Sequence, residues 1–164
     1  VARRLVRFAS EDVGIADSNA LVVAVAAYQA CHFNGMPECS VNLAQAVVYL
    51  SMAPKSNALY AAYENCKEDA VKMLAEPVPL QIRNAPTRLM EDLHYGEGYI
   101  YAHNTEEKVT AMRCLPDSLK DKRYYVPTGE GKEAEVKEKL DRILKWKREQ
   151  ENKKRQGNKE SKEE

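Results

Sequence analysis

The sequence predicts an all-α fold: a helical bundle with a long extended arm rich in tyrosine and proline, and a charged C-terminal helix. Three consecutive segments in the first half have helical patterns, at 20–33, 41–53 and 57–73. The links between them are short, so neighbouring helices are expected to pack roughly antiparallel. The length of 164 residues, of which 44% are hydrophobic, is enough for one domain with a real core.

The apolar patterns of these three segments place them at the centre of the domain. The stretch 20–28 is apolar without interruption, and a helix that is apolar on all sides has to be surrounded by other protein. The other two segments each carry apolar residues at the spacing of one helix face. These are Leu43, Ala46, Val47 and Leu50 in 41–53, and Leu59, Tyr60, Tyr63, Cys66, Ala70 and Met73 in 57–73.

The N-terminal stretch 1–13 is amphipathic, and Gly14 is expected to end this helix with a left-handed backbone conformation. Val1 stands in place of an initiating Met and is already in helical register. We therefore expect the chain to be a segment of a longer protein.

Residues 76–127 lack a helical period and predict an arm that lies across the bundle. Within it, 86–93 is expected to form a short helix and 115–119 one helical turn. Tyrosines combine an apolar ring with a polar tip, and are expected to hold the arm down at intervals. They are Tyr95, Tyr99, Tyr101, Tyr124 and Tyr125.

A hinge at 129–131 precedes the charged C-terminal helix. From Lys132 the sequence is helical, with a narrow apolar stripe made of Val136, Leu140, Ile143 and Leu144. Residues 150–164 are expected to be a frayed helix or disordered, because the apolar stripe stops before them. The sequence thus divides into 1–127, a helical oligomerisation domain including the arm, and 128–164, the C-terminal helix and tail.

The charge balance gives no overall case for binding nucleic acid or an anionic membrane. Lysine and arginine number 25, and so do aspartate and glutamate. No apolar run reaches the roughly 18 residues that a membrane helix needs, and no secretory pattern opens the chain.

Motifs for nucleotide or metal chemistry are absent from the sequence. It has neither a phosphate-binding G-x-x-x-x-G-K-[ST] loop nor G-x-G-x-x-G. The four cysteines are irregularly spaced without C-x-x-C, which predicts buried free thiols. Cys31 and His32 are adjacent, but neighbouring side chains on a helix do not face each other. We therefore expect no catalytic, cofactor-binding or metal site here.

Two sets of residues are candidates for binding nucleic acid. Arg3, Arg4 and Arg7 can contact phosphates, together with the lysines of the C-terminal tail. The tyrosines of the arm can stack on single-stranded bases, although such platforms usually lie in a basic groove and the local charge here is mixed. A solvated helix face and amphipathic contacts are the competing interpretations.

Long strings of the sequence resemble the C-terminal domain of the MgsA/RarA family of AAA+ ATPases, which includes the eukaryotic Werner-helicase-interacting protein. The resemblance covers about three quarters of the chain. His94 stands where glycine is commoner in the family, which argues against a tight left-handed turn there. The matching strings are 3–14, 26–33, 35–39, 42–50, 53–56, 78–80, 83–90, 95–99, 115–116 and 124–125.

The resemblance implies a clamp-loader-like ATPase that acts in replication and at stalled forks, with this region collar-like and assembling subunits, typically into a tetramer. ATP and Mg²⁺ would bind upstream of this chain. Possible partners are single-strand-binding protein and DNA, through the full-length protein. No membrane partner is implied. The location would be cytoplasmic and nucleoid-associated in bacteria, or nuclear in a eukaryote.

Residues that are large, amphipathic or sited at helix ends are candidates for the interface between subunits. They are Phe8, Tyr28, His32, Phe33, Met36 and Tyr49. The main alternative is a DNA-binding helical module that uses Arg3, Arg4, Arg7 and the tail lysines. A third possibility is an autonomous enzyme that uses Cys31 or His32.

Overall fold

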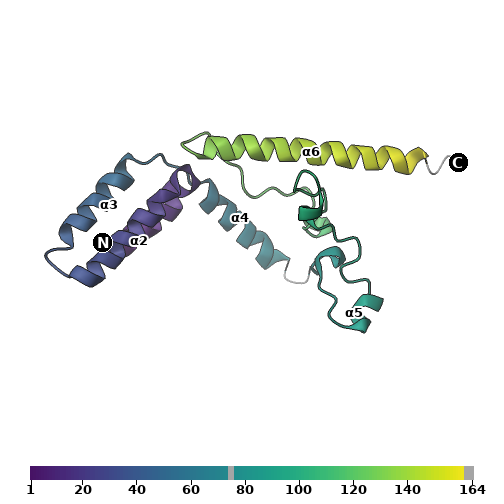
Figure 1. Ribbon diagram of the computed structural model, residues 1–164, viewed down its shortest axis with the longest axis horizontal. Helices are drawn as coiled ribbons and strands as arrows, with labels where there is room; N and C mark the ends of the chain where they lie inside the picture. Colours follow the sequence, from purple (N-terminus) through teal and green to yellow (C-terminus); the bar gives the residue numbers. More distant parts are fainter. Residues whose placement is uncertain (74–75, 161–164) are drawn as a thin grey trace. The chain divides into compact units, whose positions relative to one another are not determined.

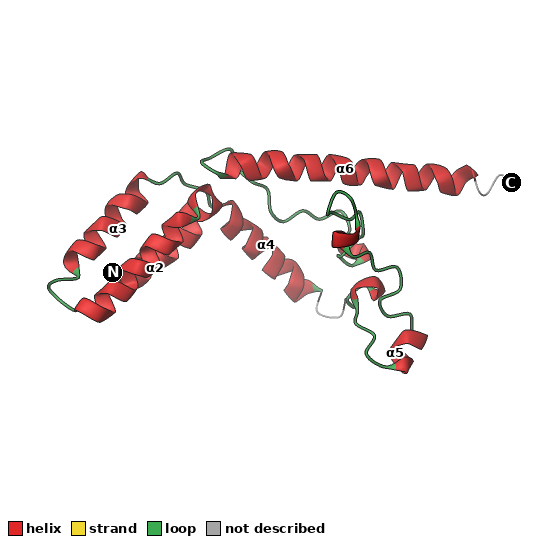
Figure 2. Ribbon diagram, viewed as in Figure 1, coloured by secondary structure: helices red, strands yellow, loops and turns green. Residues whose placement is uncertain are grey.

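The computed structural model describes residues 1–73 and 76–160. These residues form helices, turns and loops, and no strand occurs among them (Figure 2), which confirms the all-α fold. The α-helices of the described chain are labelled in Figure 1 where there is room. They are α1 (Ala2–Phe8), α2 (Asn19–Asn34), α3 (Ser40–Met52), α4 (Ala58–Lys72), α5 (Arg88–Asp92) and α6 (Glu133–Glu160).

The chain folds into two compact units, which we call the bundle unit and the arm unit. The bundle unit consists of Val1–Lys72 and Arg123–Lys139, and the arm unit of Met73–Lys122 and Leu140–Glu164. These boundaries differ from the predicted division at 127/128, which stays a prediction. The expectation that the arm lies across the bundle also stays a prediction.

The core of the bundle unit is built from small side chains. Helix α2 packs against α1 and against α3, which runs back alongside it (Figure 1). Leu50 of α3 is the largest apolar side chain among those fully buried. Alanines at the contact let the helix backbones approach closely, and interior side chains pack at crystal-like density. The core cluster consists of Ala9, Val13, Ala20, Ala24 and Leu50.

The turn that follows α1 is a tight contact point of the bundle unit. The helix predicted over 1–13 forms, with its last turn, Ala9–Val13, as a π-helix. Gly14 follows it with a positive φ of +56°, but its ψ of −133° lies outside the left-handed helical region, so the predicted left-handed cap does not form. A Cβ atom on Gly14 would lie 2.8 Å from the Ser56 carbonyl oxygen. The Ser56 amide donates to the Asp12 carbonyl at 2.9 Å. The link before α4 is therefore held against this turn.

Helix α4 buries a different face from the predicted one. Its buried residues are Ala58 and Ala62, while Leu59, Tyr60 and Tyr63 of the predicted stripe are exposed. The contacts of α4 with the short helices Ala9–Val13 and Gly14–Asp17 explain this, because they leave room only for small side chains. The prediction that the larger residues form the packed face is wrong here.

The arm unit consists of short helical pieces joined by irregular chain. Helix α5 confirms the centre of the predicted helix at 86–93, and the 3-10 turn Asp117–Leu119 confirms the predicted turn at 115–119. His94 adopts φ +61°, so the left-handed turn that its identity argued against does form. Its Nδ1 atom lies 2.6 Å from Glu97 Oε2, a contact that joins the two ends of this turn.

Helix α6 extends further than the apolar stripe suggested. Residues 150–160 are helical, and the remainder of the predicted frayed or disordered tail, 161–164, lies outside the described residues. The predicted stripe residues Val136, Leu140, Ile143 and Leu144 are half-buried. Within the described residues, no helix has the length and apolar character needed to cross a membrane.

Candidate oligomerisation surface

Helix α3 carries a second apolar face on the side opposite its buried one. Val41, Ala44, Val48 and Met52 recur at i, i+3, i+7 and i+11 and so line one side of the helix. We call these four residues the outer α3 stripe. Val41 is 75% exposed, Val48 64% and Met52 82%, whereas Ala46 and Leu50 on the other side are buried. The stripe is therefore apolar surface that the bundle unit leaves uncovered.

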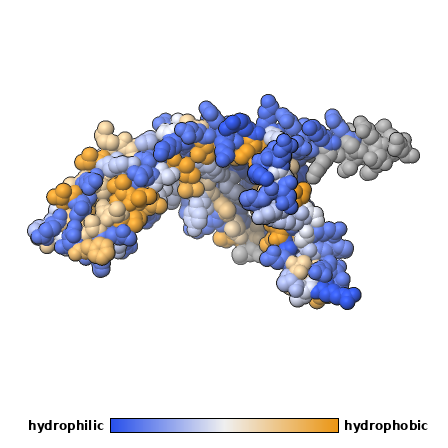
Figure 3. Space-filling model, viewed as in Figure 1, coloured by the Kyte–Doolittle hydropathy of each residue, from blue (hydrophilic) through white to orange (hydrophobic). Residues whose placement is uncertain are grey.

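Helix α2 also presents apolar side chains to solvent. Leu21, Val25 and Tyr28 recur at i, i+4 and i+7 on a side away from its buried alanines, and all three are exposed. Figure 3 shows hydrophobic residues gathered on the visible surface of α2 and α3. A shallow groove between these helices has alanine walls, with Ala26, Ala30 and Gln45 among its lining residues. Exposed apolar surface on this scale is typical of sites that bind another protein.

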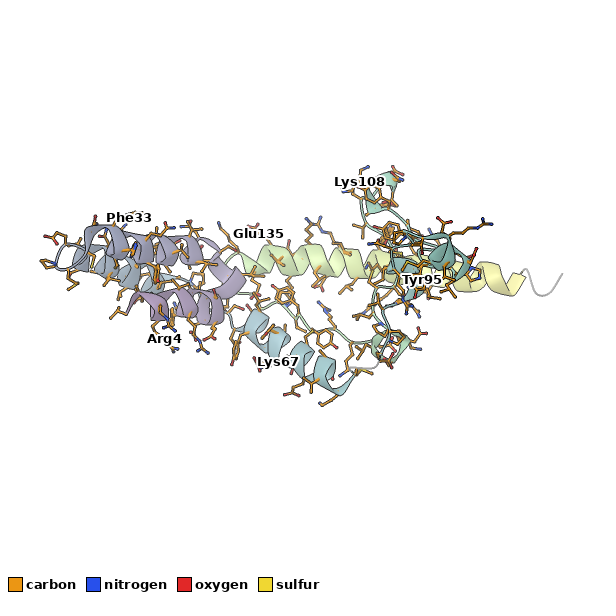
Figure 4. All side chains as sticks on the ribbon, turned by 90° about the horizontal axis from the view of Figure 1, so that it is seen from below. Arg4, Phe33, Lys67, Tyr95, Lys108 and Glu135 are labelled. Atoms are coloured by element: carbon orange, nitrogen blue, oxygen red, sulfur yellow. The ribbon has the colours of Figure 1, made fainter. Side chains whose placement is uncertain are left out.

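The sequence-predicted interface residues fall into two groups. Tyr28, His32, Phe33 and Met36 are exposed in the second half of α2 and the turn after it. Phe33 projects near the end of α2 (Figure 4), and the rings of His32 and Phe33 meet edge to face with centroids 6.1 Å apart. These four side chains are available for contact with another molecule.

Phe8 and Tyr49, the other two predicted residues, are partly buried against the core cluster. The Tyr49 hydroxyl donates to Asp17 Oδ2 at 2.7 Å and accepts from Asn19 Nδ2 at 3.0 Å. The Phe8 ring lies under the ammonium group of Lys55, which is 5.8 Å from the ring centroid. Both side chains therefore hold the bundle unit together internally.

The outer α3 stripe was not among the predicted interface residues, although the sequence carries its signal. The residues that share a helix face with Ala46 are apolar, and so are those that share a face with Val48. Helix α3 therefore has an apolar face on each side. One of these faces covers the core, and the other has no covering element in the bundle unit. Sequence pattern alone does not decide which face is which.

The predicted nucleic-acid residues lie on α1. Arg7 Nε donates to Glu11 Oε1 at 2.7 Å, and this hydrogen bond and the charge of Glu11 raise the pKa of Arg7. Arg3 and Arg4 are exposed, and Arg4 points away from the neighbouring helices (Figure 4). The tail lysines Lys137 and Lys139 are exposed on the first turns of α6. The charge of Arg7 is thus already paired with Glu11 of the short helix Ala9–Val13.

A buried carboxylate joins the start of α6 to the bundle unit. Glu133, the first residue of α6, is 0% exposed. It accepts hydrogen bonds from the Tyr125 hydroxyl at 2.6 Å and the Thr128 amide at 3.1 Å, and also from the Thr128 hydroxyl. Burial by itself would raise the pKa of Glu133, but hydrogen bonds from Ser56, Thr128 and Tyr125 lower it overall. Burial and the bond to Glu133 raise the pKa of Tyr125.

Gly131 is a close backbone contact at one end of the predicted hinge 129–131, which stays a prediction. Gly131 has φ +53°, and a Cβ atom there would clash with the Ala16 carbonyl and lie 2.6 Å from Pro54 Cγ. The next amide, of Lys132, donates to the Ala16 carbonyl at 2.9 Å. Only glycine fits so close to another backbone. We call this region, formed by Ser56, Tyr125, Thr128, Gly131 and Glu133, the α6 junction.

The tyrosines of the predicted arm have different roles. Tyr124 donates from its hydroxyl to Asp69 Oδ2 of α4 at 3.1 Å, and Tyr125 binds Glu133 as described. Both fulfil the predicted role of amphipathic contacts. In the arm unit, the ring of Tyr95 lies 4.9 Å from the Arg83 guanidinium, whereas Tyr99 and Tyr101 are exposed.

The cysteines agree only in part with the prediction of buried thiols. Cys39 is buried and Cys31 half-buried, but Cys66 and Cys114 are exposed. Burial and a hydrogen bond with the Cys39 side chain raise the pKa of Cys31. A raised thiol pKa disfavours the nucleophilic thiolate, which argues against the enzymatic interpretation of Cys31.

The chain forms a helical domain with an uncovered apolar face. Its sequence similarity to known proteins shows which family it belongs to. The sequence profile described as MgsA AAA+ ATPase C terminal matches residues 1–144. The chain is 47% identical over 144 residues to a replication-associated recombination protein A of Haemophilus influenzae, covering 87% of this chain and 32% of that protein. It is 44% identical over 126 residues to the ATPase WRNIP1 of Dictyostelium discoideum, covering 76% of this chain and 14% of that protein.

A third relative, the replication-associated recombination protein A of Escherichia coli K12, is 44% identical over 141 residues, which cover 85% of this chain and 32% of that protein. The chain belongs to the MgsA family of AAA+ ATPases and corresponds to the C-terminal region of its members. It spans about a third of the length of these bacterial relatives.

Proposed function

We propose that this chain is the oligomerisation and partner-docking domain of an AAA+ ATPase that acts in DNA replication, recombination and the maintenance of stalled forks. The names of its bacterial relatives, replication-associated recombination protein A, support this process. In this proposal the chain performs no catalysis itself, and ATP and Mg²⁺ bind to an ATPase core elsewhere in the protein. The assembly is a homo-oligomer, with a tetramer the expected state.

The further partners and the location follow the same proposal. Single-strand-binding protein and DNA are reached through the full-length protein. The site of action is the cytoplasm and nucleoid of a bacterium, or the nucleus of a eukaryote.

The outer α3 stripe is the observation that carries the proposal. Val41, Val48 and Met52 are exposed together on one side of a helix whose other side covers the core. Burying apolar surface contributes about 25 cal/mol per Å², so about 400 Å² of contact per subunit contributes about 10 kcal/mol before association costs. The loss of translational and rotational freedom on association costs a similar amount of free energy. A stable assembly therefore needs most of the exposed apolar surface to be buried.

The mechanism that we propose is geometric. Helix α2 contacts α1 and α3 directly, and the core between them is close-packed, so the bundle unit behaves as a rigid piece. When the outer α3 stripe is covered by another subunit, the bundle units are fixed relative to one another. Motor domains attached to them are then held at a set spacing, which lets neighbouring subunits act together.

The experiment compares two substitutions that differ only in their place on the bundle unit. Val48 of the stripe and Val71 of α4 are both 64% exposed, and both are valines within helices. Val48→Arg is expected to dissociate the oligomer, because a charge buried in an apolar contact is strongly unfavourable. Val71→Arg is expected to leave it intact. Mass is read by light scattering at matched concentrations, and equal behaviour of the two variants would contradict the proposal.

A further inference from the structure

The groove between α2 and α3 is open to solvent in the bundle unit. Its volume is about 290 Å³, and its lining residues belong to α2 and α3. Among the described residues, α1 packs against both helices but lines no part of this groove. The walls are mostly alanine, so they leave room for the side chains of another helix. A groove of this kind is where an amphipathic helix of a partner lays its apolar face.

Exposed apolar side chains lie on both sides of the groove. On α2, Val22, Ala26 and Phe33 recur at i, i+4 and i+11 and share one side of the helix. Val22 is 63% exposed and Phe33 82%. On α3, Gln45 of the groove wall lies beside the outer α3 stripe, because it precedes Val48 by three residues. We call the surface formed by Val22, Ala26, Phe33, Gln45 and the outer α3 stripe the α2–α3 face.

The α2–α3 face carries no charge. Helices α2 and α3 contain no aspartate, glutamate, lysine or arginine, whereas 30% of the residues in the whole chain are charged. Nucleic acids and anionic membranes are bound through lysine and arginine, so neither fits this face. A charged protein surface would lose its hydration here without gaining an opposite charge. The occupant that fits is an uncharged helix with an apolar side.

A second copy of the chain supplies such a helix. Its outer α3 stripe carries exposed apolar side chains at helical spacing, and α3 has no charged residue. Helices α4 and α6, by contrast, carry many charged residues. Two identical faces that pair around a two-fold axis bury the same residues on both copies. If α3 of each copy lies in the groove of the other, both grooves and both stripes are covered together.

We propose that two copies of the chain pair around a two-fold axis through their α2–α3 faces, with α3 of each copy in the groove of the other. The outer α3 stripe then packs on the side of the second copy's α2 that carries Val22, Ala26 and Phe33. This inference rests on the proposed function. It adds the surface that the stripe contacts and the symmetry of that contact.

Gln45 specifies this pairing. It lies on α3 between the groove and the stripe, close to the middle of Ser40–Met52. When two antiparallel copies of α3 cross at their middles, the two Gln45 side chains meet near the axis. A side-chain amide both donates and accepts, so these two side chains hydrogen-bond to each other. A polar residue within an apolar helix contact fixes the register of the helices.

The test places opposite charges at position 45. In Gln45→Glu two carboxylates face each other across the axis, and in Gln45→Lys two ammonium groups do, which repels the copies. Because a two-fold contact joins copies in pairs, each variant alone should lower the mass measured by light scattering about two-fold. An equal mixture of the two variants should restore the wild-type mass, since a carboxylate then faces an ammonium group. Gln45 is exposed, so neither substitution should disturb the fold.

Asn65 of α4 provides the matched control. It is also an exposed side-chain amide within a helix, but it lies outside the α2–α3 face. Asn65→Glu and Asn65→Lys should therefore each keep the wild-type mass. Native mass spectrometry of the mixed Gln45 variants, with one of them isotopically labelled, should show pairs that contain one copy of each.

The outcomes separate this pairing from the proposed function. A wild-type chain that is a monomer contradicts both. If the wild-type chain assembles and Val48→Arg dissociates it, the proposed function stands. In that case, Gln45 variants that keep the wild-type mass, or a mixture of them that stays dissociated, would show that the two-fold pairing is wrong.

Discussion

The α6 junction and the outer α3 stripe differ in how their side chains are surrounded. At the junction, Glu133 is fully buried, and its carboxylate accepts hydrogen bonds from Tyr125 and Thr128. The stripe consists of apolar residues, and nothing in the bundle unit covers them. The junction is complete within one chain, whereas the stripe is covered only in the assembly that we propose.

In our proposal, the residues that stabilise the fold of the bundle unit are therefore different from those that mediate its assembly. The alanine-lined core is narrow, so much of the apolar surface of α2 and α3 faces outward. The junction compensates by holding distant segments of the chain through polar contacts that are internally satisfied. Substitutions at the junction should therefore alter stability, and substitutions in the stripe should alter assembly.

The largest loss of stability is expected from Glu133→Ala. Removing the carboxylate leaves buried donors of Tyr125, Thr128 and Ser56 without their acceptor, at a cost of about 3 kcal/mol in the free energy of unfolding. Glu133→Gln keeps one acceptor oxygen and should cost about half as much. Glu135→Ala is the control, because Glu135 is exposed on the same helix (Figure 4). Urea unfolding measures all three, and equal losses at positions 133 and 135 would mean that the junction contributes nothing.

A second effect, of about 2 kcal/mol, is expected from Gly131→Ala. The added Cβ meets the Ala16 carbonyl and Pro54, and φ at Gly131 is +53°. Gly129→Ala is the matched control, since a Cβ at Gly129 meets nothing within 4 Å. The two variants are compared by thermal unfolding. If Gly129→Ala proves as destabilising as Gly131→Ala, the close contact at Gly131 is not the cause.

The contribution of Glu133 should also depend on pH. Its pKa in the folded chain is below the ordinary value of 4.5, so its stabilising effect is present above that pH and is lost as pH falls through the folded pKa. The stability gap between wild type and Glu133→Gln should therefore be constant near neutrality and should narrow in acid. A gap that widens below pH 4.5 would show the opposite sign of the shift.

The smallest effect on the bundle is expected from Arg3→Ala/Arg4→Ala, because both side chains are exposed on α1. Oligomer mass and stability should be unchanged. The same variant tests the DNA-binding alternative in a mobility-shift assay at low salt. We expect no shift from the wild-type chain, and a salt-sensitive shift that disappears in this variant would favour the alternative.

The sequence predicted the fold better than the surface. Helical periodicity placed α2 and α3, and a single residue, Gly14, correctly marked the end of the first helix. The sequence pattern did not show which of the two apolar faces of α3 is buried. It also did not show that α4 buries its alanines and exposes its larger apolar residues. Tertiary contacts decide which apolar face of a helix is covered. Glu133 gave no signal at all, since a glutamate at a helix start usually lies in solvent.

The family was also readable from the sequence, and the profile match over residues 1–144 confirms it. What the long strings did not reveal is the close approach at Gly131. A Gly-x-Gly fragment is typical of flexible turns, and only the position of the Ala16 backbone shows that this glycine is packed.

Sedimentation velocity of the unmodified chain over a range of concentrations tests the central claim most directly. If the outer α3 stripe is covered by other copies, the chain should sediment as a multimer, with a tetramer expected, and dissociate only on strong dilution. A chain that remains a monomer at the highest concentrations, with Val41, Val48 and Met52 still open to solvent, would contradict the account.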